Sequence, residues 1–280
     1  MSISAKDVKQ LRDMTGAGMM DCKKALTEAN GDIDGAIEIL RKKGQKLSAK
    51  RAEREANEGV VIALTSHNRN NGVVIRLSCE TDFVAKGESF IAFANAIAEI
   101  ALSKLPASLD DLLALSFDSE LSIGEKITEQ IGVIGEKIEV KDYAKIETSA
   151  GAGQVIPYIH MGYRAGVIVA LNQEGPELVD YGKDVAMQVA AMKPIAVDKA
   201  NVPQEVIDKE VEIGKELARN EGKPEAMLEK IALGRLNKFF KETTLLNQVF
   251  VKNSKETIGS YLKSKHPDLT VTDFKHISLS

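Results

Sequence analysis

The chain has 280 residues, of which 44% are hydrophobic and 28% charged, and its formal net charge is -4. This length accommodates two or more domains, and the composition is that of an ordinary globular protein rather than a disordered or fibrous one. The acidic balance argues against wholesale nucleic-acid binding, which requires a basic face to displace counterions from phosphates. A protein partner is therefore the simpler expectation.

The residue counts also exclude several kinds of site. The first residues lack the apolar core of a secretory signal, and no stretch reaches the roughly 18 apolar residues of a membrane span, so we predict a cytoplasmic chain without membrane contact. Cys22 and Cys79 are too few and too scattered for a disulfide scaffold or a thiolate metal cage. The histidines show no ligand spacing: His67, His160, His266 and His276. We predict no metal and no cofactor.

Residues 1–54 are predicted to form a three-helix unit followed by a basic linker. Apolar residues recur at helical spacing in three short segments, which contain Val8 and Leu11, then Met19, Met20, Ala25 and Leu26, then Ile33, Ala36, Ile37 and Leu40. Glycines in TGAG and NGD supply the two turns between them. The segment Arg41 to Arg54 is rich in Lys and Arg but has no aromatic residue for base stacking. It is interpreted as a solvated, partly helical tether, with an RNA or acidic-partner patch as the alternative.

Residues 55–147 are predicted to form an antiparallel sheet covered on one face by helices. Val60 to Thr65 and Val73 to Cys79 read as two strands joined by a hairpin turn, and Ile138 to Glu147 reads as a third. Phe90, Phe93, Ile97 and Ile100 recur at the spacing of a helix. Cys79 shares a strand face with aliphatic residues and is therefore expected to be buried and inert.

Residues 148–280 repeat this pattern, which indicates an internal duplication. GVIVAL at Gly166 to Leu171 resembles GVVIRL at Gly72 to Leu77, and each copy has an earlier strand before it and an apolar helix after it, here through Val185, Val189 and Met192. The second copy has Gly175, Pro176 and Glu177 where the first has Thr81, Asp82 and Phe83. Because a feature needed for the fold should occur in both halves, this asymmetry points to a function for the acid–aromatic pair.

An insertion at about 200–245 interrupts the second half. Apolar residues predict two helices that are joined at Gly222 and Pro224 into an antiparallel hairpin. The apolar positions are Val206, Val211, Ile213 and Leu217 on the first helix and Met227, Leu228, Ile231, Leu236 and Phe239 on the second. The final TVTDFKHISLS alternates like a last strand for the second sheet. The predicted class is thus α+β, with two duplicated subdomains and an inserted hairpin.

Candidate chemistry is sparse. A thiol enzyme would use Cys79 as nucleophile, His67 as base and Asp82 or Glu80 as orienter, but burial raises a thiol's pKa and suppresses its reactivity. The glycine-rich TGAG and GAG segments lack the lysine of a P-loop, so turns are their expected use. Phe83 has two interpretations that the residues alone leave open. It is either an exposed anchor for another protein or a loop side chain that folds back onto its own sheet.

Four long motifs occur in order along the chain: LRDMTGAGMMDCKKALTEANGD at Leu11 to Asp32, ETDFVAK at Glu80 to Lys86, HMGYRAGVIVAL at His160 to Leu171, and GKPEAMLEKIALGRLNKFFKE at Gly222 to Glu242. Together they resemble the bacterial elongation factor Ts family, the guanine-nucleotide exchange factors of elongation factor Tu. The resemblance covers nearly the whole length. It implies a ubiquitin-associated-like (UBA-like) fold for the amino-terminal unit and a coiled-coil module for the inserted hairpin.

The same resemblance implies a set of partner-binding residues. Arg12, Met19 and Met20 would grip a helix of the partner's nucleotide domain. Thr81, Asp82, Phe83 and Val84 match the segment that disturbs the partner's magnesium site, and His160 would make a second contact. These residues imply a non-enzymatic exchange factor that promotes GDP release from elongation factor Tu so that GTP can rebind.

Two rival hypotheses remain at this point: a helical adaptor that binds a protein or ubiquitin-like surface without exchange activity, and the thiol enzyme. Self-association into a homodimer through the hairpin is a further alternative.

Overall fold

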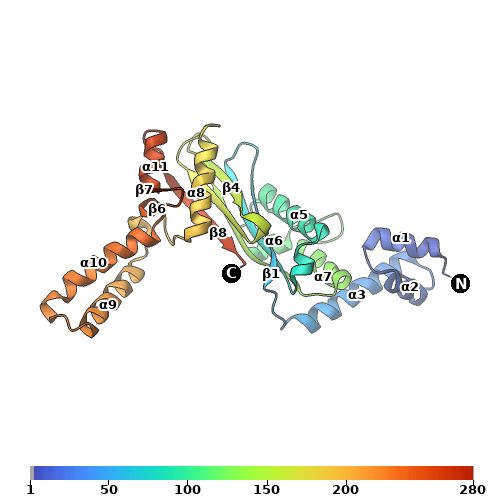
Figure 1. Cartoon of the computed structure of the whole chain (residues 1–280). Helices are drawn as coiled ribbons and strands as arrows, with labels where there is room; N and C mark the ends of the chain where they lie inside the picture. The colour runs from blue at the N-terminus through green and yellow to red at the C-terminus, as the bar shows by residue number, and fades with distance from the viewer. Residues whose placement is uncertain (1–2, 280) are drawn as a thin grey trace.

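Two three-stranded antiparallel sheets form the centre of the molecule in the computed structural model (Figure 1). The structure describes residues 3–279, so the outermost ends of the predicted first and last domains lie outside the described residues. The first sheet has the order β1 (Glu58–Thr65), β2 (Asn71–Cys79), β3 (Ile138–Glu147), and the second has the order β4 (Gln154–Ile159), β5 (Ala165–Leu171), β8 (Val271–Ser278). The three strands predicted in the first half and the last strand of the second half are confirmed. The class is α+β.

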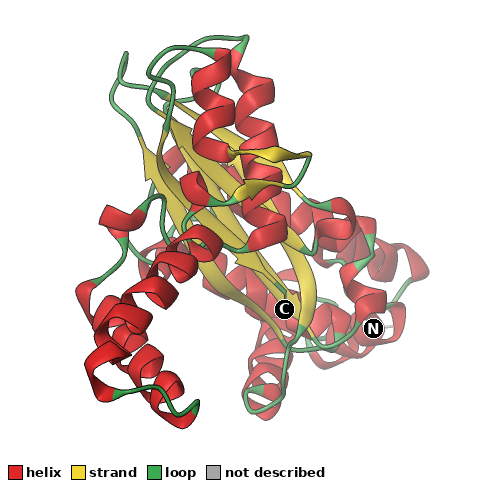
Figure 2. Ribbon diagram, turned by 60° about the vertical axis from the view of Figure 1, so that its left-hand side comes forward, coloured by secondary structure: helices red, strands yellow, loops and turns green. Residues whose placement is uncertain are grey.

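Helices make up most of the remaining structure (Figure 2). The α-helices are α1 (Ala5–Thr15), α2 (Met19–Glu28), α3 (Ile33–Arg51), α4 (Asp82–Ala85), α5 (Glu88–Lys104), α6 (Leu109–Ala114), α7 (Ile123–Ile134), α8 (Leu178–Met192), α9 (Gln204–Asn220), α10 (Glu225–Thr243) and α11 (Ile258–Lys265). Short elements complete the fold: the 3-10 turns η1 (Met161–Tyr163), η2 (Lys199–Asn201) and η3 (Leu245–Asn247), and the ribbon β6 (Val249–Phe250) with β7 (Asn253–Thr257). None of the helices in residues 3–279 is long and apolar enough to span a membrane.

The two sheets repeat each other in detail. In each, the middle strand carries one register shift at the same aligned position, between Arg76 and Leu77 in β2 and between Ala170 and Leu171 in β5. The two sheets face each other through a shared apolar layer. Gly72 faces Val155, and its counterpart Gly166 faces Val61. These reciprocal glycine contacts let the sheets approach closely, and they support the duplication inferred from the sequence.

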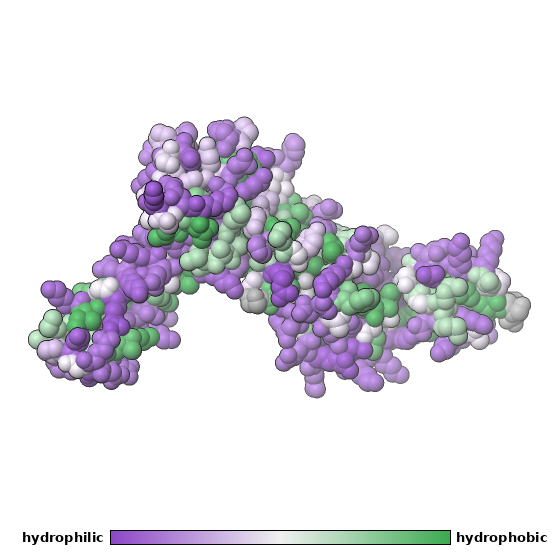
Figure 3. Space-filling model, in the orientation of Figure 1, coloured by the Kyte–Doolittle hydropathy of each residue, from purple (hydrophilic) through white to green (hydrophobic). Residues whose placement is uncertain are grey.

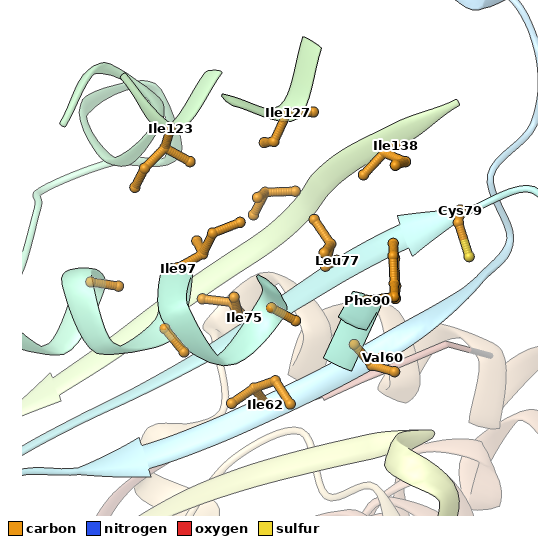
Figure 4. Close-up of a cluster of buried hydrophobic side chains, with 14 of the residues drawn as sticks. Val60, Ile62, Ile75, Leu77, Cys79, Phe90, Ile97, Ile123, Ile127 and Ile138 are labelled. Carbon is orange, nitrogen blue, oxygen red and sulfur yellow. The ribbon is translucent and has the colours of Figure 1, made fainter. Parts of the chain in front are cut away.

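The outer face of each sheet is covered by helices, as predicted. On the first sheet, α5 and α7 enclose a core that includes Ile75, Leu77 and Ile97 (Figure 4). On the second sheet, α8 and α11 bury Val185 and Val189. The prediction that Met192 belongs to this apolar face is wrong, since its side chain is 46% exposed at the last residue of α8.

The predicted three-helix unit is present as α1, α2 and α3, with its own small core around Leu11 and Leu26. The basic segment that follows is helical, as expected, but it is not a separate tether because it forms the second half of the continuous helix α3. That half also packs on α7, where a Cβ placed on Gly44 would lie 2.9 Å from the Thr128 carbonyl oxygen. The inner side of the segment is therefore a helix–helix contact rather than a solvated surface.

The predicted hairpin is formed by α9 and α10, which extend from the opposite end of the molecule (Figure 1). Its seam is made by buried residues that are mostly small: Gly214, Ala218, Leu228, Ala232 and Leu236. Several residues predicted for the apolar side are exposed instead, namely Ile213, Leu217 and Met227. Figure 3 shows apolar surface on this end of the molecule. The small residues let the two helices pack closely around the two leucines, and the exposed apolar side chains lie outside the seam.

Candidate functional site

Phe83 lies on a short helix that follows β2 directly. Thr81 caps the helix, because its side-chain oxygen accepts a hydrogen bond from the Val84 N–H at 3.4 Å. Val84 and Ala85 turn inward onto the first-sheet core. Phe83 points away from it and is 86% exposed. Of the two alternatives left by the sequence, the side chain therefore adopts the exposed one.

Asp82 shares the outer surface of this turn with Lys86. The Lys86 ammonium lies 2.7 Å from an Asp82 carboxylate oxygen, one helical turn away. This hydrogen bond, together with the lysine charge, lowers the pKa of Asp82 below its usual value. Both side chains are well exposed, so the pair is screened by solvent and adds little stability. A carboxylate held ionised in the open can accept hydrogen bonds from a partner.

Two glutamates hold the base of the turn. The sequence analysis did not propose Glu136, and it considered Glu80 only for thiol chemistry. Glu136 accepts hydrogen bonds from the Thr81 N–H at 3.0 Å and from the Thr81 hydroxyl at 2.7 Å. Glu80 accepts from Arg51 at 2.6 Å and from Arg54 at 3.0 Å. Burial alone raises the pKa of Glu80, but hydrogen bonds from the Lys137 N–H and the two arginines outweigh it and lower the pKa from 4.5 to about 2. The Glu136 contact spans 55 residues, so no local pattern could have revealed it.

The β4–β5 connection of the second half lies beside α4, the turn that carries Asp82 and Phe83. One groove is lined from the first half by Asp82, Ala85 and Lys86 and from the second half by Gly162, Tyr163 and Arg164, together with Glu58, Gly59, Ile91 and Leu279. Arg164 lies 3.7 Å from Glu58 across it. His160 precedes this groove, is exposed, and its Nδ1 lies 3.0 Å from the Tyr158 hydroxyl. The neighbouring Met161 is 86% exposed. The structure thus places the two sequence-predicted segments next to each other.

The predicted amino-terminal contact residues form a separate surface. Met19 is 48% and Met20 64% exposed at the start of α2, and Arg12 is exposed near the end of α1. Met14, which the sequence reasoning did not include, is also exposed, in the last turn of α1. The 19-residue helix α3 extends from this unit to Arg51, a length of about 28 Å. The structure therefore does not bring Arg12, Met19 and Met20 together with Phe83.

The structure contradicts the thiol-enzyme hypothesis. Cys79 is fully buried at the end of β2, on the same side as Leu77 (Figure 4). Burial raises the pKa of its thiol to about 12. His67 lies in the β1–β2 turn, at the other end of the two strands, roughly 20 Å away along the hairpin. Neither the ionisation nor the distance suits a nucleophile and its base.

Comparisons with known proteins agree along the full chain. The family model described as "Elongation factor TS" matches residues 80–280. The chain is 50% identical over 280 residues to elongation factor Ts of Cytophaga hutchinsonii, covering 100% of this chain and 99% of that protein. It is 51% identical over 278 residues to that of Amoebophilus asiaticus, covering 99% of each. Elongation factor Ts of Clostridium botulinum is 46% identical over 265 residues, covering 94% of this chain and 87% of its own.

Proposed function

The chain belongs to the elongation factor Ts family of translation elongation factors, and we propose that it binds elongation factor Tu carrying GDP and promotes release of the GDP. GTP then rebinds to the empty partner. No covalent step is involved, so the protein acts as an exchange factor and not as an enzyme with a chemical substrate. We place this activity in the cytoplasm, with no cofactor and no direct contact to nucleic acid.

The observation that carries the proposal is the exposure of Phe83 on an anchored turn that the second half lacks. A GTPase holds its nucleotide through phosphate contacts and through a Mg²⁺ ion that bridges phosphate oxygens to the protein. Phe83 enters between helices of the partner and displaces groups that support this ion. Its burial there contributes roughly 1.5 to 3 kcal/mol. Asp82 accepts hydrogen bonds that stabilise the displaced arrangement, while Thr81 and Val84 support the turn from behind.

Nucleotide release follows from thermodynamic coupling. If the factor weakens nucleotide binding by some ratio, bound nucleotide weakens binding of the factor by the same ratio. The factor must therefore bind the empty partner strongly, which requires a larger surface than one turn provides. Arg12, Met19 and Met20 supply affinity at one end of the molecule, and His160 supplies a second contact beside the Asp82 turn.

The finer description of the modules is part of the same proposal. Residues 1–54 act as a UBA-like domain whose third helix continues through the basic segment and packs on α7, and residues 55–147 and 148–280 act as two core subdomains. The α9–α10 hairpin, in the insertion at about 200–245, acts as a coiled-coil module that contacts another part of the partner or a second copy of the chain. The separate apolar clusters of the helical unit and of the two outer sheet faces support this division.

Stopped-flow release of fluorescent GDP from elongation factor Tu tests the proposal. The wild-type chain should accelerate release, and Phe83→Ala should slow the accelerated rate by about tenfold or more, since the lost burial is worth at least ~1.5 kcal/mol. Asp82→Ala should slow it less, and both effects should shrink as Mg²⁺ is lowered. Val249→Ala truncates another exposed apolar side chain, outside the proposed contacts, and should leave the rate unchanged. No acceleration by the wild type would overturn the proposal, and an adaptor would show no effect of Phe83→Ala.

A further inference from the structure

Glu136, in the connection between α7 and β3, binds the start of the Phe83 turn with one carboxylate. One of its oxygens accepts hydrogen bonds from the Glu80 N–H at 3.1 Å and the Thr81 N–H at 3.0 Å. The other accepts from the Thr81 hydroxyl at 2.7 Å. That hydroxyl oxygen in turn accepts from the Val84 N–H and caps the helix. The glutamate therefore fixes the residue from which the Phe83 helix begins.

Glu80 makes the reciprocal contact to the segment that contains Glu136. Its carboxylate accepts from the Lys137 N–H at 2.6 Å, so the residue pairs 80–81 and 136–137 exchange carboxylate–amide bonds in both directions. The ammonium of Lys137 also donates to the carbonyl oxygens of Ala52 and Arg54, each at 3.1 Å. These charge-assisted bonds join three segments that are far apart in the sequence: the chain after α3, the end of β2 and the start of β3.

The turn needs this external support because it cannot hold its own shape. A helix of four residues is too short to be stable by itself, since the cost of nucleation is spread over few hydrogen bonds. Phe83 is too exposed to be held by packing, and the Asp82–Lys86 ion pair lies on the surface. The orientation of Phe83 is therefore set by the packing of Val84 and Ala85 and by the base of the turn, where Glu136 makes its contacts.

We propose that Glu136 is a positioning residue for nucleotide exchange: by holding Thr81, it fixes the direction in which Phe83 enters the partner. This inference rests on the proposed function but goes beyond it, because it assigns a role to a residue outside the proposed contact set. A side chain that displaces helices in another protein meets resistance. If the start of the turn at Thr81 moves instead, part of the binding energy orders the turn rather than displacing groups in the partner.

The test measures GDP release from elongation factor Tu over a range of factor concentrations. Glu136→Gln keeps the size of the side chain but removes its charge, and its new NH2 group faces either the two backbone N–H donors or the Thr81 hydroxyl, whose own proton then loses its acceptor. The release rate at saturating factor should fall about tenfold, because misplacing a group that acts on another is costly even at small displacements. The concentration for half-maximal rate should change by less than about twofold, since the other contact surfaces supply affinity. Glu136→Asp keeps the charge and should lie between.

Three observations separate positioning from a general loss of structure. Unfolded factor lowers the active concentration but not the rate at saturation, so a fall in that plateau does not arise from misfolding. Glu99→Gln makes the same charge change on an exposed position of α5 and should have no effect. In a double-mutant cycle, Glu136→Gln should slow release much less in the Phe83→Ala background than in the wild type, because the residue acts mainly through that ring.

The outcomes are distinguishable. If Phe83→Ala slows release and Glu136→Gln leaves the plateau unchanged, the role of Glu136 is wrong and the proposed function stands. If Glu136→Gln slows release equally with and without Phe83, the glutamate does not act through Phe83 and the inference is also wrong. If the wild type accelerates nothing, both proposals fail together.

Discussion

The two halves of the core have the same sheet topology but differ in the segment that follows the central strand. After β2 the chain forms a capped turn that exposes Phe83, and after β5 it passes through Gly175, Pro176 and Glu177 into α8. The strands, the register shifts and the facing glycines are shared. The second half shows that a sheet of this kind folds without the acid–aromatic pair, so the pair is dispensable for folding and available for recognition.

The largest expected effect comes from replacing the facing glycines that the two halves share. A Cβ on Gly166 would lie 2.7 Å from Val61, and one on Gly72 would overlap Val155. Gly166→Val and Gly72→Val should each lower the free energy of unfolding by about 3 kcal/mol, because overpacking strains both sheets.

Urea denaturation measures the loss in the free energy of unfolding for both valine variants. Gly234→Ala is the control, since a Cβ there meets nothing within 4 Å in helix α10, and it should raise stability by about 0.5 to 1 kcal/mol. If only one of the two valines destabilises the protein, the two halves do not contribute equally to the interface.

Glu80 and Glu174 sharpen the comparison, because they occupy aligned positions. Glu80 is bonded by two arginines and a backbone N–H, whereas Glu174 is exposed and accepts one bond, from the Gly151 N–H. Glu80→Gln should cost on the order of 2 kcal/mol at neutral pH. Glu174→Gln should cost less than about 1 kcal/mol.

The Glu80 effect has a defined pH dependence. The pKa of the folded-state carboxyl is lowered from 4.5 to about 2, so its stabilisation is fully present above the unfolded value and is lost as pH falls through the folded one. Denaturation curves of the wild type and Glu80→Gln should therefore converge between about pH 5 and about pH 2. A constant difference over this range would contradict the ion-pair assignment.

Thr81 and Thr257 are matched caps in the two halves. Each side-chain oxygen accepts from a backbone N–H in the first turn of its helix, Val84 in α4 and Ser260 in α11. Replacing either by Ala should cost about 1 kcal/mol of stability. Only Thr81→Ala should speed hydrogen exchange of the Val84 amide, measured by NMR. Equal effects of both variants on that amide would show that the turn loosens with the whole protein rather than by itself.

The sequence was a good guide wherever the determining contacts are local. The alternation of Val73, Ile75, Leu77 and Cys79 predicts β2 because a strand exposes alternate residues to one face, and the strand Ile138–Glu147 was found for the same reason. The helix α4 was missed, since four residues carry no periodicity. The hairpin seam was predicted only in part: Leu228 and Leu236 are buried there as expected, but small residues such as Gly214 and Ala232, which the apolar pattern does not mark, bring the helices together.

The candidate site divides in the same way. The pair Asp82–Phe83 was found from its absence in the second copy, which is a comparison within one sequence. Its exposure could not be decided, because whether a ring packs back depends on neighbours from other elements. Glu136 could not be found at all, because it reaches Thr81 only after α7 and β3 are in place. The proposed contact residues could therefore be predicted from the sequence, whereas the proposed positioning residue, Glu136, could be identified only from the tertiary fold.

The smallest expected effect on stability tests the comparison most directly. Phe83→Glu places on the first turn the residue type that the second half has at the aligned position, Glu177. Since Phe83 is 86% exposed, the free energy of unfolding should change by less than about 0.5 kcal/mol in urea. GDP release from elongation factor Tu should nevertheless fall to the rate without factor, because a charged side chain cannot enter an apolar space between helices without a large desolvation cost. A substantial loss of stability would mean that the ring serves its own fold, and the argument from the second half would then fail.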